Sequence, residues 1–292
     1  MRPGLFQKRY YLSYKHGFHV GNHGDVSKHV VLIELIGRLK DLGLPLAYID
    51  SHAGSGFYRL KMGEPARTDE YKRGIEKLLE LQTNNHPMKN YLSLIKSFNK
   101  SDEFRAYPGS PMIAASLLDD RDQGVAFELH NKEFPLLQRH LNQFPNFTPL
   151  HQDGVAGLLT HVQKFKNFQI LALVDPSYEM PNECDQLAAM FSKVAHVENL
   201  CMAIWYPLFQ GESKHENMIQ GFKSKCDSWL NLSLTVAGND FEKKMYGSGM
   251  FILNPPKGIE TSLRSAYDIL DEKLRQKENP ILRKFETSTH IN

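Results

Sequence analysis

Apolar residues along this chain fall into two alternating patterns, short continuous runs and helical spacing. The run Ile170–Val174 is apolar at every position, which is typical of a strand buried on both faces of a parallel sheet. From Val26 onward apolar residues recur every three or four positions, which predicts a helix with Asp25 as its N-cap and Gly43 as its stop. Continuous runs predict strands at 46–50, 125–128, 148–151, 170–174, 201–205 and 250–253. Helical spacing predicts helices at 110–118, 132–144, 154–162 and 184–196, another at 212–228, and a last one from 259.

The period changes towards the end of the chain. Leu230, Leu232, Leu234 and Val236 alternate with polar residues, which predicts a further strand close to the one at 250–253. Strands that alternate with helices and are closed by two neighbouring strands indicate the α/β class. We therefore predict a Rossmann-like, mostly parallel sheet with an antiparallel edge hairpin.

Residues 57–105 differ from this pattern. They are polar and contain two helical patterns, at 70–81 and 89–98, with no convincing strand. We interpret them as a small helical insertion in one α/β domain. The predicted organisation is an N-terminal arm with the first helix and strand at 1–56, the insertion at 57–105 and the rest of the domain at 106–292.

Composition limits the class of protein. Of the 292 residues, 41% are hydrophobic and 23% are charged, as in ordinary soluble domains. The three cysteines lie far apart without metal-binding spacing and are typical of reduced thiols. No apolar run approaches the roughly 20 residues of a membrane-spanning helix, and no apolar stretch typical of a signal peptide follows the N-terminus. We expect a cytoplasmic protein without a membrane partner.

The net charge of +2 does not by itself indicate a nucleic-acid partner. Residues 1–30, however, contain five Lys or Arg against one acid, interleaved with four histidines and five aromatic residues. Such an arm suits phosphate contact and base stacking, although a solvated tail with a few buried rings has the same composition. The histidine spacing matches no standard zinc site, so we expect no metal.

Four predicted strands end in residues suited to ligand binding, and open parallel sheets bind ligands at that edge. Gly54 and Gly56 let the backbone approach a nucleotide closely, although such glycines also serve plain turns. Glu128 can accept hydrogen bonds from both ribose hydroxyls, and the helical insertion explains its unusually large separation from Gly54. Asp153 with Gly154 can hold an adenine amino group, although Asp-Gly is also a common turn.

The segment Asp175-Pro176-Ser177-Tyr178 directly follows the apolar strand at 170–174 and resembles the catalytic loop of amino-methyltransferases. An adenine amine is a poor nucleophile because its lone pair is delocalised into the ring. Asp175 and the backbone carbonyl of Pro176 can each accept one N–H hydrogen bond, which favours a tetrahedral nitrogen. Proline fixes the direction of that carbonyl, and Tyr178 offers a ring for an extruded base. We predict adenine-N6 methylation driven by positioning and electrostatics.

Ser177 departs from the usual loop, which has a second proline at this place. The carbonyl of Pro176 is retained, so the hydrogen-bonding scheme is retained as well. What is lost is rigidity, which predicts either a slower enzyme or a degraded site.

Taken together, these residues resemble the RlmJ family of adenine-N6 methyltransferases of bacterial large-subunit ribosomal RNA. The first ~10 residues and Ser177 do not fit the family pattern. The matching stretches are 12–19, 21–26, 28–29, 50–56, 107–111, 128–130, 153–154, 205–207, 247–250 and 254–256.

The resemblance implies S-adenosylmethionine as cofactor and Asp175 as the catalytic acceptor. It also implies that Tyr14, His16 and Lys28 line the target pocket. Lys28 can in addition pair with the cofactor carboxylate or a substrate phosphate, and we include it among the catalytic residues. The cofactor contacts that the resemblance implies are His29, His52, Ser110, Glu128, Asp153, Gly154 and Asp175. From the sequence alone, His29 and His52 are more typical of structural histidines.

The partner that the resemblance implies is large-subunit ribosomal RNA, and we expect it to be bound before full assembly of the subunit. Little chain remains after the loop for a separate target-recognition domain, so substrate recognition is expected from the N-terminal arm and the insertion, as suits RNA. A DNA-adenine or protein-glutamine methyltransferase stays open, as does a weakly active RNA-binding protein that holds the cofactor. A nicotinamide dehydrogenase is disfavoured because the glycine turn lacks the G-x-G-x-x-G pattern.

Overall fold

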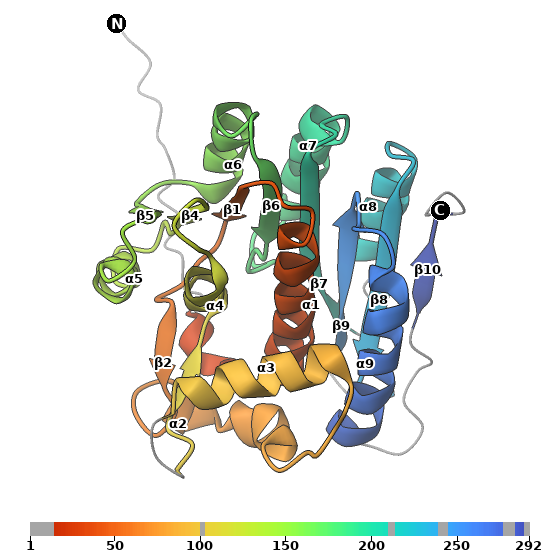
Figure 1. Ribbon diagram of the computed structural model, residues 1–292. Helices are drawn as coiled ribbons and strands as arrows, with labels where there is room; N and C mark the ends of the chain where they lie inside the picture. The colour runs from red at the N-terminus through yellow and green to blue at the C-terminus, as the bar shows by residue number, and fades with distance from the viewer. Residues whose placement is uncertain (1–14, 100–102, 210–213, 239–244, 277–283, 289–292) are drawn as a thin grey trace, which may run out of the picture.

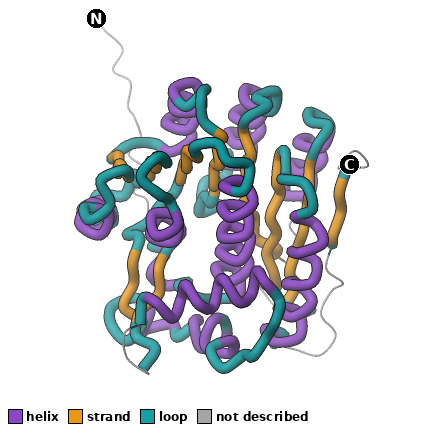
Figure 2. The backbone as a smooth tube through the Cα atoms, in the orientation of Figure 1, coloured by secondary structure: helices purple, strands orange, loops and turns teal. Residues whose placement is uncertain are grey.

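The computed structural model describes residues 15–99, 103–209, 214–238, 245–276 and 284–288 and contains one large mixed sheet (Figures 1 and 2). The strand order is β10-β8-β9-β7-β6-β1-β4-β5. The strands are β1 Leu46–Asp50, β4 Gln123–Phe127, β5 Phe147–Leu150, β6 Gln169–Val174, β7 Leu200–Phe209, β8 Trp229–Thr235, β9 Met245–Leu253 and β10 Phe285–Thr287. Every strand predicted from the sequence is present, and the short edge strand β10 was not predicted because it has no apolar run.

The five neighbouring strands β5, β4, β1, β6 and β7 are parallel to one another. Strands β9, β8 and β10 extend the sheet with antiparallel pairing. The predicted mostly parallel sheet with an antiparallel edge is thus confirmed. The chain runs outward from β1 through β4 to β5 and then returns to place β6 on the other side of β1. This reversal lies between β1 and β6, and in open α/β sheets ligands bind beside such a switch point.

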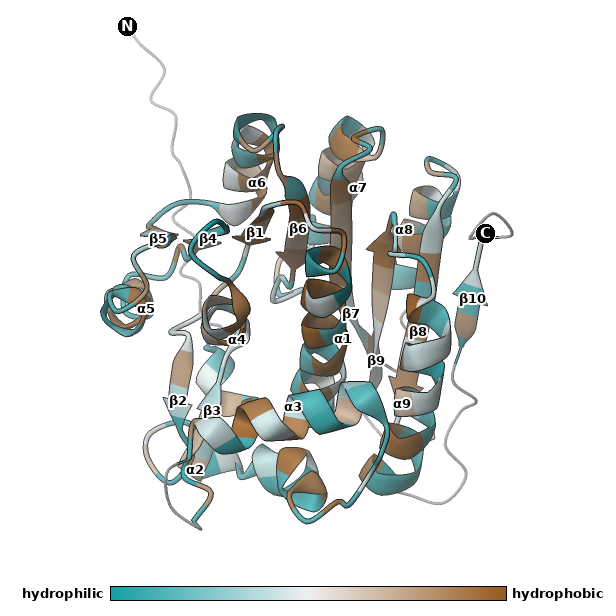
Figure 3. Ribbon diagram, viewed as in Figure 1, coloured by the Kyte–Doolittle hydropathy of each residue, from teal (hydrophilic) through white to brown (hydrophobic). Residues whose placement is uncertain are grey.

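Helices cover both faces of the sheet, and each face has its own apolar core (Figure 3). One core is shared by α1 His23–Lys40, α4 Ser110–Leu117, α5 Phe134–Leu141 and α9 Ile259–Leu274. The other core contains α6 Gly154–Lys164, α7 Glu183–Val194 and α8 Lys214–Lys223. Strand residues alternate between the two cores because successive side chains point to opposite faces. Within the described residues, no helix is long and apolar enough to cross a membrane.

Helix α1 begins earlier than its apolar pattern predicts. Asn22 is the N-cap, and its side chain accepts a hydrogen bond from the amide of Asp25 at 3.0 Å. The prediction that Asp25 caps this helix is therefore wrong. Asp25 lies inside the first turn and is buried, where its carboxylate is used by the functional site described below. The helix ends at Lys40, and Gly43 follows in a left-handed conformation with φ of 78°.

The insertion contains a small sheet that the sequence did not reveal. Strand β2 Phe57–Arg59 pairs in antiparallel register with β3 Ala106–Pro108, so the insertion leaves and rejoins the main domain through two adjacent strands. The interpretation of 57–105 as having no strand is wrong at this point, because three-residue strands are too short to show a period. Between the strands lie α2 Pro65–Thr68, the 3₁₀ helices η2 Glu70–Arg73 and η3 Ile75–Leu78, and α3 His86–Ser97. The helix predicted at 70–81 is thus two 3₁₀ turns.

The insertion packs against the first core instead of forming a core of its own. Figure 1 shows α3 lying across the lower ends of α1 and α9. Inside this contact, the hydroxyl of Tyr107 on β3 lies 2.9 Å from Nδ1 of His29 on α1 and 3.0 Å from the hydroxyl of Tyr91 on α3. These buried hydrogen bonds connect the insertion to the helix that carries several predicted site residues.

Candidate active site

Two cavities open at the carboxyl ends of the parallel strands and share one wall. The first has a volume of about 630 Å³ and the second about 520 Å³. Both are lined by His16 and by three residues of the predicted catalytic loop, Asp175, Pro176 and Ser177. Cavities of this size can each hold a small molecule or one nucleotide. The loop that follows β6 therefore separates two adjacent binding sites and is exposed to both.

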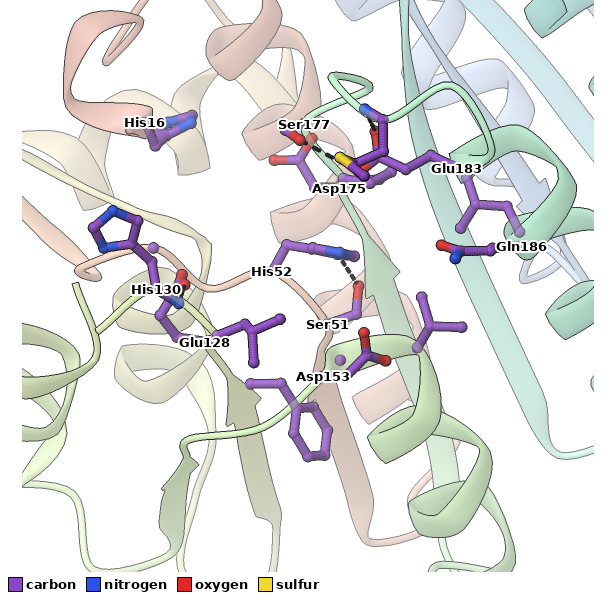
Figure 4. Close-up of a pocket in the computed structure, with 18 of the residues that line it drawn as sticks. His16, Ser51, His52, Glu128, His130, Asp153, Asp175, Ser177, Glu183 and Gln186 are labelled. Carbon is purple, nitrogen blue, oxygen red and sulfur yellow. Dashed lines mark hydrogen bonds between the residues drawn. The ribbon is translucent and has the colours of Figure 1, made fainter. Parts of the chain in front are cut away.

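The first cavity lies over the switch point between β1 and β6 (Figure 4). Ser51, His52 and Gly54 follow β1, and Glu128 follows β4. In Figure 4, Glu183 and Gln186 from α7 face these residues from the other side of the cavity. Side chains from both halves of the sheet thus meet here, as the convergence of the strand ends predicts.

Glycine positions shape the floor of the first cavity. Gly54 has a φ of 58°, a left-handed conformation that glycine adopts without strain. Gly154 begins α6, and a Cβ on it would overlap the backbone of Ser51. The N-terminus of α6 can therefore approach the end of β1 closely. Asp153 caps this helix, with Oδ1 accepting the amide of Ala156 at 2.8 Å, and its carboxylate faces the cavity.

The carboxylate of Asp175 is held by a buried ion pair. Nζ of Lys28 lies 2.5 Å from Oδ2 of Asp175 and 2.8 Å from Oδ1 of Asp25. The side chain of Lys28 is only 4% exposed. Burial alone would lower the pKa of Lys28, but the two carboxylates raise it above its ordinary value. Lys28 is therefore a permanent cation that lies between Asp25 on α1 and Asp175 in the loop after β6.

Asp25 extends this network to the wall shared by the cavities. Its Oδ2 accepts the amide of Gly21 at 2.8 Å and lies 3.0 Å from Nε2 of His16. Burial would raise the pKa of Asp25, but the charges of His16 and Lys28 hold it well below its ordinary range. His16 and Asp175, which each line both cavities, are thus connected through the buried ion pair of Asp25 and Lys28.

Ser177 is connected to the start of α7 by Glu183. The hydroxyl of Ser177 donates to Oε1 of Glu183 at 3.3 Å, and the amide of Met180 donates to Oε2 at 3.0 Å. Burial raises the pKa of the Glu183 carboxyl. The loop that lacks its second proline is therefore held by one carboxylate that contacts it at two positions.

Tyr178 has a φ of 56°, which is uncommon for a residue with a side chain. Its hydroxyl donates to the backbone carbonyl of Trp205 at 2.6 Å, and the two rings are tilted with centroids 6.1 Å apart. Both residues line the second cavity. The unusual backbone and this tether fix the aromatic ring on the side of the loop that faces the second cavity.

The structure divides the predicted cofactor contacts into two groups. His52, Gly54, Glu128, Asp153, Gly154 and Asp175 all line the first cavity. His29 and Ser110 do not line it. His29 is completely buried against Tyr107, and burial lowers its pKa to about 3. Of the predicted target-pocket residues, His16, Lys28 and Tyr178 line the second cavity, and Tyr14 lies outside the described residues.

Ser110 belongs to a buried polar cluster behind the glycine turn. The hydroxyl of Tyr48 donates to Oδ2 of Asp50 at 2.7 Å, and the amide of His52 lies 3.3 Å from Oδ1. Burial raises the pKa of Asp50 to about 6, although hydrogen bonds from Tyr48 and Ser110 act in the opposite direction. Asp50 and Ser110 thus fix the backbone that carries His52.

Sequence reasoning missed several residues that line the cavities. Glu183 and Gln186 face the first cavity, and Arg73 and Trp205 line the second. Arg73 comes from the insertion, and no local motif indicates that η2 reaches the site. Trp205 lies in the stretch 205–207, which resembles the family pattern. That resemblance indicated its importance, but the sequence did not predict what Trp205 does.

Comparisons with known proteins agree with this architecture. A family model described as ribosomal RNA large subunit methyltransferase D, RlmJ, matches residues 43–285. Two curated relatives are named ribosomal RNA large subunit methyltransferase J, and both are 32% identical to the chain. The relative from Haemophilus influenzae aligns over 266 residues and the one from Escherichia coli over 265, in each case 90% of this chain and 94% of the relative.

A solved structure extends the similarity to three dimensions. The crystal structure of a protein from Legionella pneumophila superposes with a TM-score of 0.83 and is 26% identical in sequence. The match covers 93% of this chain and 99% of that chain, so the two proteins share one fold over nearly their whole lengths.

Proposed function

Because the chain belongs to the RlmJ family of ribosomal RNA large subunit methyltransferases, we propose that it is a cytoplasmic enzyme that methylates the N6 amino group of an adenine in large-subunit ribosomal RNA, with S-adenosylmethionine as methyl donor. The observation that carries this proposal is the wall shared by the two cavities. Methyl transfer requires donor and acceptor sites that are adjacent but separate, and the loop Asp175-Pro176-Ser177 lies between two cavities of suitable size.

The residues of the first cavity fit the methyl donor. Glu128 is an acceptor for ribose hydroxyls just after β4, and Asp153 with Gly154 lines the same cavity as an acceptor for an adenine amino group. When bound, S-adenosylmethionine supplies a methyl group activated by a positively charged sulfur. The carboxylates of Glu128, Asp153 and Asp175 give this cavity a negative character that suits a cationic ligand.

The second cavity fits the target adenine. The ring of Tyr178, fixed by its hydrogen bond to Trp205, offers a surface on which an extruded base can stack. Asp175 and the carbonyl of Pro176 then accept the two N–H groups of the adenine amine, which directs its lone pair towards the first cavity. Lys28 holds the Asp175 carboxylate in one orientation by their 2.5 Å ion pair. The proton that the amine loses after methylation can pass along its hydrogen bond to the Asp175 carboxylate.

A labelled-methyl assay tests this proposal. The protein is incubated with S-adenosylmethionine and either deproteinised large-subunit ribosomal RNA, intact large subunits, double-stranded DNA or a glutamine-containing peptide. We expect label in N6-methyladenine from deproteinised RNA, and more from it than from intact subunits if methylation precedes assembly. Label in DNA or peptide alone would assign one of the alternative amino-methyltransferases.

Variants connect the label to the site. Asp175→Asn keeps an acceptor oxygen but loses the charge that pairs with Lys28, so activity should fall at least about a hundredfold. The matched control is Asp185→Asn on the exposed side of α7, which should retain full activity. Binding of S-adenosylhomocysteine without any turnover on RNA would instead identify a cofactor-holding RNA-binding protein.

A further inference from the structure

Arg73 brings a positive charge from the insertion to the second cavity. It is the last residue of η2 and lines the same cavity as the loop residues Pro176 and Tyr178. Its side chain is exposed and forms no hydrogen bond or ion pair with another residue of the described ranges. The neighbouring Lys72 differs in this respect, because it pairs with Asp69 at 2.7 Å and does not line the cavity.

Backbone packing holds Arg73 at this place. The amide of Ile75 donates to the carbonyl of Gly21 at 2.9 Å. A Cβ on Gly74 would overlap the backbone of Gly21 and Asn22, so only glycine permits this close approach. The insertion therefore docks directly onto the segment that precedes α1, and the residue before Gly74 is fixed at the edge of the cavity.

The acidic residue of η2 is already used in this contact. Glu70 accepts a hydrogen bond from Nδ2 of Asn22 at 2.9 Å and lies 3.2 Å from Nδ1 of His19. Burial would raise the pKa of Glu70, but its contacts with His19 and Asn22 lower it, so it is ionised and partnered. Arg73 is left as a cation that faces the cavity without being neutralised by Glu70.

His23 supplies a second, independent indication of a ligand. It is the first residue of α1, lines the second cavity and is only 7% exposed. Its Nε2 is buried and has no hydrogen-bond partner among the described residues. Burial lowers the pKa of His23 to about 4, so the ring is neutral near pH 7. An unpartnered buried nitrogen is costly in a folded protein, and a ligand that hydrogen-bonds to it removes that cost.

We propose that Arg73 and His23 form a nucleotide-recognition site in the second cavity, in which Arg73 binds a backbone phosphate of the RNA and Nε2 of His23 hydrogen-bonds to the extruded nucleotide. This inference rests on the proposed function, because it assumes that the second cavity receives the target adenosine. Arginine suits the phosphate because its planar guanidinium can make two parallel hydrogen bonds to phosphate oxygens. The insertion would thereby take part in substrate binding through a single side chain.

Steady-state methylation of deproteinised large-subunit RNA at several salt concentrations tests the phosphate contact. Arg73→Gln should raise KM for RNA about tenfold, since a charge-assisted hydrogen bond contributes about that factor. The slope of log affinity against log salt should fall by about one. Arg73→Lys should recover most of the affinity, and the matched control Lys72→Gln should behave as the wild type within about twofold.

The outcomes separate this inference from the proposed function. If Arg73→Gln and Lys72→Gln have the same KM and salt slope, the phosphate site is overturned while RNA methylation stands. If the wild-type protein methylates none of the RNA, the proposed function fails first. Titration with S-adenosylhomocysteine should give wild-type affinity for Arg73→Gln, which shows that the first cavity is intact.

His23 is tested with a pair of variants. His23→Phe keeps the ring volume but removes Nε2, and it should lower kcat/KM for RNA about tenfold. His23→Gln keeps a polar group near Nε2 and should retain more activity than the phenylalanine variant. Wild-type kcat/KM in His23→Phe would overturn the role of His23, and if that variant does not fold, a His23→Gln enzyme no better than His23→Ala overturns it instead.

Discussion

Nζ of Lys28 lies 2.5 Å from Oδ2 of Asp175, so the first helix and the loop after β6 are joined by a buried ion pair. Asp25 contacts the same ammonium at 2.8 Å, which places one cation between two carboxylates. This buried ammonium has two consequences. It stabilises the fold only while both carboxylates are present. It also sets the orientation of the predicted catalytic carboxylate of Asp175.

Lys28→Met should therefore affect both stability and activity. Two buried carboxylates would lose their common partner, so the free energy of unfolding should fall by about 3–5 kcal/mol. Turnover should fall on the order of a hundredfold because Asp175 loses the charge that orients it. Urea denaturation and RNA methylation measure the two effects. Lys28→Arg restores the charge and should recover part of the stability, and an unchanged unfolding midpoint in Lys28→Met would show that the ion pair contributes little.

The Ser177–Glu183 contact is expected to replace the rigidity of the missing proline. Glu183→Ala should lower kcat about tenfold in the wild-type background, because two hydrogen bonds to the loop are lost. The same substitution in a Ser177→Pro background should cost clearly less, since the proline restrains the loop by itself. The double-mutant cycle is measured as kcat at saturating RNA. Asp185→Ala on the same helix is the control, and identical effects of Glu183→Ala in the two backgrounds would refute the coupling.

Two helical glycines are expected to respond in opposite directions to alanine. In Gly154→Ala the new Cβ would overlap the backbone of Ser51, so the start of α6 must move away from Ser51 and change the first cavity, which both residues line. Affinity for S-adenosylhomocysteine should fall at least about tenfold, and overpacking should cost about 1–3 kcal/mol. Gly37→Ala in α1 meets no atom within 4 Å and should stabilise the protein by about 0.5–1 kcal/mol. Calorimetric titration measures the affinity and thermal unfolding measures the stability. Equal affinities of the two variants for S-adenosylhomocysteine would mean that α6 does not form a wall of the cofactor site.

The buried His29 should make stability depend on pH. Burial lowers its pKa to about 3 in the folded state, while the ordinary value is 6.5. Between these values the unfolded chain binds a proton that the folded protein does not, so stability is lost as pH falls from about 7 towards 3. Each such group contributes at most about 1.4 kcal/mol per pH unit. Asp50, with its pKa raised to about 6, acts in the opposite direction between about pH 4 and 6.

Comparison with a His29→Asn variant isolates this contribution. Asparagine keeps a polar group near the hydroxyl of Tyr107 but does not titrate. The free energy of unfolding of the variant should therefore fall less steeply between pH 7 and 5 than that of the wild type. Parallel curves for the two proteins would show that His29 is not the source of the acid sensitivity.

The amino-acid sequence by itself determined the order of the main strands and helices, the fold class and the place of the predicted catalytic loop. These follow from local patterns, since an apolar run such as Ile170–Val174 is typical of a buried strand and Asp175 then lies at its carboxyl end. The grouping of Glu128 and Gly154 at the first cavity also followed from their positions just after strands, because parallel strands bring their ends to one edge of the sheet.

Only the tertiary structure decided which side chains are partners. The pairing of Lys28 with Asp175 joins two segments that no local pattern relates, and so does the position of Arg73 and His23 on one cavity. The contact of Glu183 with Ser177 is closer in sequence, but it too depends on how α7 is oriented against the loop. The burial of His29 away from both cavities is of the same kind. Sequence periodicity reports which face of an element is buried, whereas the partner of a buried charge depends on how whole elements pack, and that is fixed only when the chain is folded.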